Sequence, residues 1–200
     1  MSAMTAAELG FRDADDGEPQ WVALVQAVYN MQLAKIDDVC NGGLRWQALE
    51  FLNGFDYKNS ISNGCFFNIA SRLALYTGNS SYADEAEVIW QWMEGVGFID
   101  AKYNVFDGAG VKNGANCTEI YKAQFSYNAG VFLHGAAAMY KFVSFLSQQI
   151  YISYPSPNSL PFPPHLLELF ILTTPLLLTT FPISPIITST NLPALNQEPH

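Results

Sequence analysis

Proline and glycine divide this chain into two unlike parts, and the division limits what the chain can fold into. All 14 glycines and all four tryptophans lie at or before Gly135, whereas ten of the 11 prolines lie at or after Pro155. Proline has no backbone N–H and interrupts the interiors of helices and sheets. We therefore expect residues 1–143 to form the folded domain. Residues 144–200 are expected to be a Pro/Leu/Thr-rich tail that is disordered or poorly packed.

Apolar residues recur at helical spacing through most of the first part. The segment from Trp21 to Ile36 begins with apolar residues at positions i, i+3, i+4 and i+7, which is the spacing of one helix face. We expect further helices over residues 1–8, 62–76, 82–94 and 122–143. Ser62 or Asn63 is suited to cap the second of these, and residues 97–110 predict a short hairpin or ordered loop. The pattern predicts an all-α fold of helical hairpins.

The charge of the chain argues against one class of partner. Eighteen acidic residues oppose nine basic ones, giving a net charge of −9, and no lysine or arginine follows Lys141. Nucleic-acid binding needs clustered lysine and arginine, so we expect no nucleic-acid partner. A neutral glycan is compatible with this charge. We recognise no Cys/His zinc spacing, Gly-rich phosphate loop or Ser-His-Asp arrangement, and we expect no metal and no cofactor.

Three motifs follow one another between residues 41 and 130: Asn41-Gly-Gly-Leu-Arg-Trp-Gln47, Tyr57-Lys-Asn-Ser-Ile-Ser-Asn-Gly-Cys65 and Gln124-Phe-Ser-Tyr-Asn-Ala-Gly130. Together they resemble glycoside hydrolase family 76, the group of fungal cell-wall mannanases and mannan-processing transglycosylases. The resemblance covers residues 1–143. It implies part of an (α/α)6 toroid and a role in hydrolysis or transfer of α-1,6-mannan, whereas an unrelated all-α domain is the alternative that periodicity leaves open.

The resemblance assigns no catalytic residue to this chain. Glycosidases of this kind use two carboxyls that flank the scissile bond. In the family these are adjacent aspartates in an Asp-Asp-Gln-Ala-Phe-Trp-Gly segment just before a helix that corresponds here to Met1–Glu8. The pair would therefore lie upstream of Met1, and we interpret Asp15-Asp16 and Asp37-Asp38 as surface and structural residues. We expect a fragment that is inactive alone, the alternative being a non-catalytic glycan-binding or structural helical module.

Seven residues are candidates for a sugar-binding wall: Trp46, Lys58, Asn59, Asn63, Asp107, Tyr127 and Asn128. Trp46 is suited to stack on a pyranose face, or to lie in the core. Lys58, Asn59 and Asn63 surround an expected helix start, where amides and free N–H groups face a ligand, although asparagine there also caps helices. Tyr127 and Asn128 lie in an otherwise apolar helix, where a buried amide needs a sugar or a loop backbone as partner. Asp107 is a turn residue first and a ligand contact second.

The cysteines and the N-glycosylation tripeptides indicate the cellular compartment in which the protein is expected. Cys40 and Cys117 both flank Gly/Asn-rich loops near the same expected end of the helices, so we expect them to form a disulfide. Cys65 is then buried or paired outside this chain. Asn79 and Asn116 each begin an N-x-[ST] tripeptide and are candidate glycosylation sites. Beside the family resemblance, these features favour an oxidising compartment and a secreted or cell-surface protein.

No targeting or anchoring segment is recognisable in this sequence. Its first residues have neither a basic n-region nor a long apolar run, so no signal peptide is visible. Residues 169–197 are uncharged, but Pro175, Pro182 and Pro185 interrupt them and no basic flank sets a topology. We therefore expect no stable membrane span.

Overall fold

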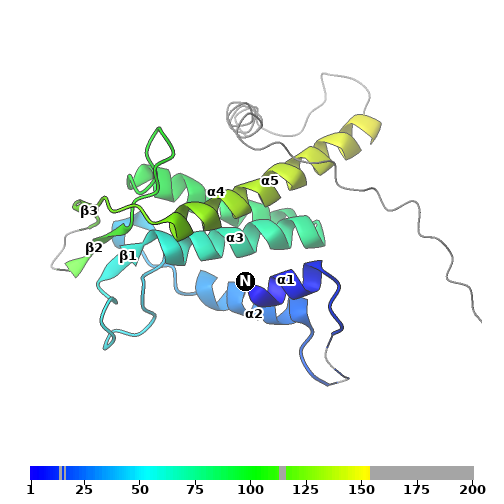
Figure 1. The fold of residues 1–200 in the computed structure, drawn as a ribbon, viewed down its shortest axis with the longest axis horizontal. Helices are drawn as coiled ribbons and strands as arrows, with labels where there is room; N and C mark the ends of the chain where they lie inside the picture. Colours follow the sequence, from blue (N-terminus) through cyan, green and yellow to red (C-terminus); the bar gives the residue numbers. More distant parts are fainter. Residues whose placement is uncertain (14, 16, 113–115, 154–200) are drawn as a thin grey trace, which may run out of the picture. The chain divides into compact units, whose positions relative to one another are not determined.

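The fold is described from a computed structural model that covers residues 1–13, 15, 17–112 and 116–153 (Figure 1). The expected tail lies outside these residues from position 154 on. Five α-helices dominate the described part: α1 (Ser2–Glu8), α2 (Trp21–Leu33), α3 (Ser60–Thr77), α4 (Ser80–Gly95) and α5 (Ser126–Ser153). The all-α prediction is confirmed. The last helix begins four residues later than expected and continues past residue 143, so the domain boundary placed there stays a prediction.

Helix α3 is the central element, and its two ends show why the sequence folds there. Asn59 has an extended backbone, and its side chain accepts a hydrogen bond from the Ser62 N–H at 3.2 Å, which is the contact of an N-cap residue. At the other end Gly78 adopts the left-handed conformation at φ 74° and donates its N–H to the Ala74 carbonyl. The expectation that Ser62 or Asn63 caps this helix is wrong, because the helix already begins at Ser60 and Asn59 is its N-cap residue.

Helix α5 lies along α3, and α4 packs on another side of it, whereas α1 and α2 pack on each other and against α3 (Figure 1). Glycines set the distance between α3 and α5. A Cβ at Gly64 would come within 2.7 Å of the Phe132 ring, and one at Gly135 within 2.6 Å of the Phe67 ring. Both helices therefore need glycine at these points to approach so closely. The rings of Phe67 and Phe132 then stack at 5.5 Å between centroids.

A small antiparallel sheet lies at the end of α3 and α5 where both helices begin (Figure 1). Its strands are β1 (Tyr57–Asn59), β2 (Gly108–Gly110) and β3 (Ile120–Tyr121), in the order β1-β2-β3. A Cβ at Gly108 would lie 2.2 Å from the Lys58 carbonyl oxygen, so the β1–β2 pairing requires glycine at that position. The hairpin expected in residues 97–110 is present as a bridge between Ile99 and Val105.

Residues Ser126–Leu146 of α5 have a mean hydropathy of 1.3 and, by length and composition alone, meet the requirements of a membrane-spanning helix. No other segment in the described part of the chain does so. A core helix meets the same requirements, and here Phe132, Met139 and Phe142 are buried in the molecule. Only 28% of the segment is buried, so α5 packs one face on the described fold and leaves the other exposed.

Candidate functional site

An open pocket of about 800 Å³ lies beside the small sheet. Its lining combines aromatic, acidic and amide side chains: Trp46, Glu50, Phe51, Leu52, Asn53, Gly54, Asp56, Tyr57, Asp107, Lys112 and Tyr121. This volume is in the range of small-molecule sites in proteins. Two of the expected sugar-binding residues, Trp46 and Asp107, lie in this lining.

Trp46 gives the pocket an exposed aromatic surface. Its side chain remains about half exposed (51%), while its backbone N–H donates to the Tyr57 carbonyl at 2.8 Å. Gly54 lies directly against the indole: a Cβ there would come within 2.2 Å of the ring, and its φ of +100° also favours glycine. The loop after Trp46 therefore folds back onto the indole and limits its movement.

Asp107 is held in place from three sides. Its backbone N–H donates to the Tyr121 carbonyl at 3.1 Å, and its carbonyl accepts from the Ser60 N–H at 2.8 Å. The Tyr57 hydroxyl donates to Asp107 Oδ2 at 2.8 Å. Burial, together with the hydrogen bond to this carboxylate, raises the pKa of Tyr57 well above its ordinary value. The phenol therefore stays protonated and orients the carboxylate, whose oxygens are suited to accept from a ligand hydroxyl.

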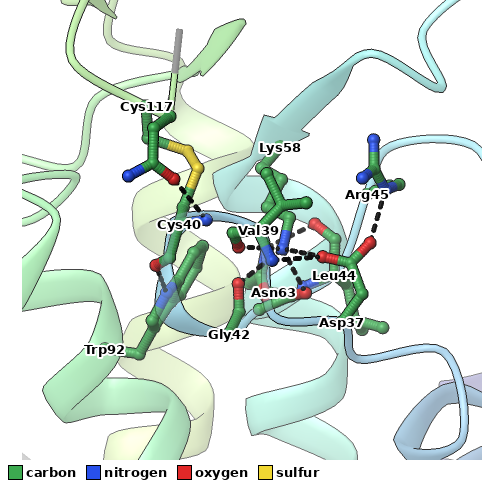
Figure 2. A network of polar contacts seen from close by, with 12 residues as sticks. Asp37, Val39, Cys40, Gly42, Leu44, Arg45, Lys58, Asn63, Trp92 and Cys117 are labelled. Carbon is green, nitrogen blue, oxygen red and sulfur yellow. Dashed lines mark hydrogen bonds and ion pairs between the residues drawn. A yellow bond between two sulfur atoms is a disulfide. The ribbon is translucent and has the colours of Figure 1, made fainter. Parts of the chain in front are cut away.

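Lys58, by contrast, does not reach the pocket. Its side chain is fully buried, and Nζ contacts Asp37 Oδ1 at 2.7 Å and the carbonyl oxygens of Val39 and Gly42 at 2.6 Å each and of Gly43 at 3.0 Å (Figure 2). Successive side chains of a strand point to opposite faces, so Tyr57 lines the pocket while Lys58 points away from it. The structure gives Lys58 contacts within the chain in place of the expected ligand contact.

Asn59 and Asn63 are also occupied within the chain. Asn59 caps α3, as described above. Asn63 is fully buried: its Oδ1 accepts from the Leu44 N–H at 2.7 Å, and its Nδ2 donates to the carbonyls of Leu44 at 3.0 Å and Asn59 at 2.8 Å. Both amides satisfy backbone groups, as buried polar side chains usually do. Their place in the motif is thus explained by their hydrogen bonds, because Asn59 caps the start of α3 and Asn63 connects that start to the loop before β1.

The two candidates on α5 differ from each other. Tyr127 is half exposed and stacks on Phe125, with ring centroids 5.3 Å apart, and it lies near enough to Tyr57 to contribute to the raised pKa of that phenol. Asn128 is fully buried, and neither its Oδ1 nor its Nδ2 has a hydrogen-bond partner among the described residues. The choice between a sugar and a loop backbone as its partner therefore stays open.

The expected disulfide is present between Cys40 and Cys117, with Cα atoms 5.8 Å apart. The Cys40 N–H donates to Asn116 Oδ1 at 2.8 Å, and the Cys40 carbonyl accepts from Trp92 Nε1 at 2.9 Å (Figure 2). Asn79 is exposed at the start of α4, where its side chain accepts from the Ser81 N–H. Both sequon asparagines thus use their side-chain oxygen as an acceptor, and their glycosylation stays a prediction.

Three residues of the two acidic pairs, Asp15, Asp37 and Asp38, lie in the described part of the chain. Asp15 forms a surface ion pair with Arg12 at 2.8 Å, and Asp16 lies outside the described residues. Asp37 binds Lys58 and Arg45, whereas Asp38 is exposed.

Sequence reasoning did not identify several pocket residues: Glu50, Asp56, Tyr57, Lys112 and Tyr121. All of these except Tyr57 lie outside the three motifs. Tyr57 begins the second motif beside Lys58 and Asn59, and its place in that motif was the available signal, because neighbouring residues of a strand point to opposite faces.

Comparison with known proteins gives a consistent result. The model of glycosyl hydrolase family 76 matches residues 1–149. Mannan endo-1,6-alpha-mannosidase DCW1 of Saccharomyces cerevisiae is 47% identical over 146 residues, which are 71% of this chain and 32% of that protein. DFG5 of Candida albicans, of the same description, is 47% identical over 148 residues, with the same two shares.

Solved structures agree with these relatives. Dfg5 of Chaetomium thermophilum in complex with glucosamine is 47% identical, with a TM-score of 0.69, over 76% of this chain and 38% of that one. An inactive double-aspartate variant of the α-1,6-mannanase of Salegentibacter sp. HEL1_6, in complex with α-1,6-mannotetrose, has a TM-score of 0.58 over 72% of this chain and 39% of that one. At 19% identity the latter indicates a shared fold only. The chain spans about a third of the length of the curated relatives it matches.

Proposed function

This chain belongs to glycosyl hydrolase family 76, and from that premise we propose that residues 1–149 form one wall of an α-1,6-mannan-binding cleft. Its helices are part of the α/α toroid of this family, as the three motifs predicted. We propose further that the 200-residue chain binds α-1,6-linked mannose oligosaccharides without cleaving them. Hydrolysis and transglycosylation would both need two carboxyls that flank the scissile bond, and the Asp-Asp-Gln-Ala-Phe-Trp-Gly segment that carries them in the family does not occur in these 200 residues.

The pocket that holds Trp46 and Asp107 is the observation that supports this proposal. An exposed indole offers an apolar surface to the C–H face of a pyranose. The carboxylate of Asp107, oriented by Tyr57 at 2.8 Å, offers acceptors to ring hydroxyls. A sugar residue presents one apolar face and a rim of hydroxyls, and this lining is complementary to both.

A second ligand class follows from the charge of the same pocket. Three acidic residues, Glu50, Asp56 and Asp107, line it beside one lysine, Lys112, whose Nζ lies 3.8 Å from Asp56. An acidic pocket favours a cation, and the similar Dfg5 structure is a complex with glucosamine. The alternative is therefore that the same pocket binds an amino sugar in place of a mannose oligosaccharide.

Calorimetric titration of the full chain with α-1,6-mannotetraose, glucosamine and maltotetraose separates these ligands. We expect binding of the mannose oligosaccharide, and about tenfold weaker binding in Trp46→Ala and in Asp107→Asn, which corresponds to about 1.4 kcal/mol. Tyr140→Ala is the matched control, because Tyr140 is similarly exposed (48%) but lies on α5 away from the pocket lining. Binding only of glucosamine supports the alternative, and no binding of either sugar contradicts both.

Reducing-sugar release from linear α-1,6-mannan tests the catalytic half of the proposal. We expect none from the 200-residue chain, because the nucleophile and the proton donor act as a unit, and the described residues of the two acidic pairs lack the surroundings to replace them. The control is a chain extended upstream through an Asp-Asp-Gln-Ala-Phe-Trp-Gly segment. Cleavage by the short chain that disappears in Asp37→Asn or in Asp15→Asn/Asp16→Asn would overturn the proposal.

We also propose that the protein is secreted or held at the cell surface. The Cys40–Cys117 disulfide supports this, because disulfides persist in oxidising compartments. The proposed partner is a mannose-containing glycan, with neither nucleic acid nor a stable membrane span involved.

A further inference from the structure

Residues 37–43 surround a buried ammonium group much as a binding loop surrounds a metal ion. Four oxygen atoms lie within 3.0 Å of Lys58 Nζ: one from the Asp37 carboxylate and three from backbone carbonyls of the loop (Figure 2). Hard cations in proteins are bound by the same mixture of carboxylate and carbonyl oxygens. The Trp92 ring completes the surroundings, with its centroid 5.9 Å from Nζ.

The backbone of this loop has an unusual course. Four successive residues have positive φ: Cys40 (56°), Asn41 (59°), Gly42 (129°) and Gly43 (77°). This course turns carbonyl groups of the loop towards one point. Buried carbonyls that converge without a donor are costly, so the loop conformation depends on a cation at that point.

Glycine is required for the loop to lie against Trp92. A Cβ at Gly43 would come within 2.3 Å of the indole, and one at Gly42 within 3.3 Å. The Asn41-Gly-Gly part of the first motif thus has a structural reason: its backbone conformation turns carbonyls towards the cation, and its glycines leave room for the Trp92 ring.

The same loop leads directly into the candidate pocket. Leu44 is tied to α3 by both its backbone groups through Asn63, and Arg45 forms a β-bridge with Lys58. Arg45 Nε also donates to Asp37 Oδ2 at 2.5 Å. The next residue, Trp46, is the exposed aromatic residue of the pocket. The buried ammonium and the indole are therefore joined through a short, hydrogen-bonded backbone.

We propose that the Lys58 ammonium is the built-in cation of the 37–43 loop, and that through this loop Lys58 positions Trp46 and Tyr57 at the pocket without touching the ligand. The part that concerns the pocket rests on the proposed function. Burial lowers the pKa of Lys58, while the hydrogen bond and charge of Asp37 oppose this change. The carboxylate thus helps to keep the buried amine charged.

Chemical rescue tests the first half of the proposal and needs no glycan. Lys58→Ala removes three methylenes and the ammonium, which together correspond to n-propylammonium. We expect n-propylammonium chloride to raise the melting temperature of Lys58→Ala in a saturable manner and to leave the wild type unchanged. Tetramethylammonium chloride at equal concentration, which cannot donate a hydrogen bond, is the salt control. Lys58→Met keeps most of the volume without the charge, and we expect no rescue of this variant by either salt.

If n-propylammonium and tetramethylammonium have the same effect on the melting temperature of Lys58→Ala, or if the variant stays unfolded in both salts, the proposal that the ammonium is the built-in cation is overturned. A merely structural role of the side-chain volume predicts that Lys58→Met behaves like the wild type, which also overturns it.

Hydrogen exchange and glycan binding test the positioning role. In Lys58→Met we expect faster amide exchange in residues 39–46, with the amides of α3 and α4 keeping their protection. A uniform increase across the chain overturns the positioning role. In Lys58→Ala we expect n-propylammonium to restore oligosaccharide affinity together with the melting temperature. Restored stability without restored affinity would show that Lys58 contacts the ligand and overturns the proposal. If the wild type binds no glycan, the proposed function fails while the rescue experiment still decides the cation.

Discussion

At the scale of single residues, Asp37 binds two cationic side chains at once because its two oxygens face different neighbours. Oδ1 accepts from Lys58 and Oδ2 from Arg45, while the carboxylate side chain itself remains about one-third exposed (34%). Water reaches the carboxylate, whereas the lysine it neutralises is fully buried. The carboxylate therefore matters chiefly through the ammonium group that would be left without a counterion.

Asp37→Asn should destabilise the protein strongly for this reason. Removing one partner of a buried ion pair costs about 3–5 kcal/mol, and because this carboxylate is partly exposed we expect the lower end, about 3 kcal/mol. Asp38→Asn is the matched control: Asp38 is exposed, and surface changes usually stay within about 0.5 kcal/mol. Urea unfolding of both variants gives the free energies of unfolding. Equal values for the two variants would contradict the role of Asp37.

The pH dependence of stability provides a second test at Asp37. Burial raises the pKa of this carboxyl, but the hydrogen bonds and charges of Lys58 and Arg45 outweigh burial, so the pKa lies below its ordinary value. Such a group adds stability above its unfolded-state pKa, about 3.9, and this stability is lost as pH falls through the lower folded-state pKa.

We therefore expect the difference in free energy of unfolding between wild type and Asp37→Asn to shrink below about pH 4. Asp100, whose pKa is lowered by hydrogen bonds from Asn104, is present in both proteins and cancels in the comparison. Urea unfolding at a series of pH values measures the difference. A difference that stays constant down to pH 2 would remove the electrostatic explanation.

The residue scale is also where sequence reasoning was weakest. The motif around β1 identified Lys58, Asn59 and Asn63 as a group, but could not distinguish ligand contacts from contacts within the chain. Polar residues near a helix start serve either purpose, and the distinction depends on the loop before β1, which is distant from Asn63 in sequence. Trp46 was a candidate because its ring is suited to stack on a sugar, and Asp107 because it is a turn residue that could also contact a ligand; both line the pocket.

At the scale of elements, the helices were predictable because apolar periodicity and the Gly- or Asn-containing breaks between helices agreed. The three strands were not predicted, because each has only two or three residues, which is too few for an alternating pattern to be recognised in the sequence. The Ala- and Gly-rich composition of residues 122–143 is compatible with the close packing of another helix, which in the structure is α3. The physical basis of this packing is the space that Gly64 and Gly135 leave for aromatic rings.

Gly135→Ala should therefore destabilise the α3–α5 contact. The added methyl group would lie 2.6 Å from the Phe67 ring, and overpacking of this kind costs about 1–3 kcal/mol. Gly130→Ala on the same helix is the control, because a Cβ there meets nothing within 4 Å and alanine favours a helix over glycine by about 1 kcal/mol. In chemical denaturation we expect Gly135→Ala to lower the free energy of unfolding and Gly130→Ala to raise it. Stabilisation by both substitutions would show that the two helices are free to separate.

At the scale of the whole molecule, the Cys40–Cys117 disulfide joins positions 77 apart in the sequence. It connects the 37–43 loop to the segment before β3, and so closes a loop of chain that contains β1, α3, α4 and β2. A loop of this length restricts the unfolded chain considerably, by about 4 kcal/mol in the chain-entropy model.

Cys40→Ser/Cys117→Ser should lower the free energy of unfolding by about that amount. Cys65→Ala is the control, since Cys65 is unpaired and half-buried in α3. Guanidinium unfolding under non-reducing conditions measures both. Reducing agent should destabilise the wild type and leave the double variant unchanged, and an equal response of the two would contradict a structural role for this disulfide.

The alternation of β1 has a consequence for redesign of the protein. Tyr57 faces the pocket and the buried Lys58 faces the 37–43 loop, so one short strand carries both a pocket residue and a residue that supports the loop. Exposed residues of the pocket rim, such as Glu50 and Asn53, are therefore open to exchange in a library that selects new sugar preferences. The Asn41-Gly-Gly segment and Lys58 should be kept constant in such a library, because they maintain the backbone on which any new specificity would be built.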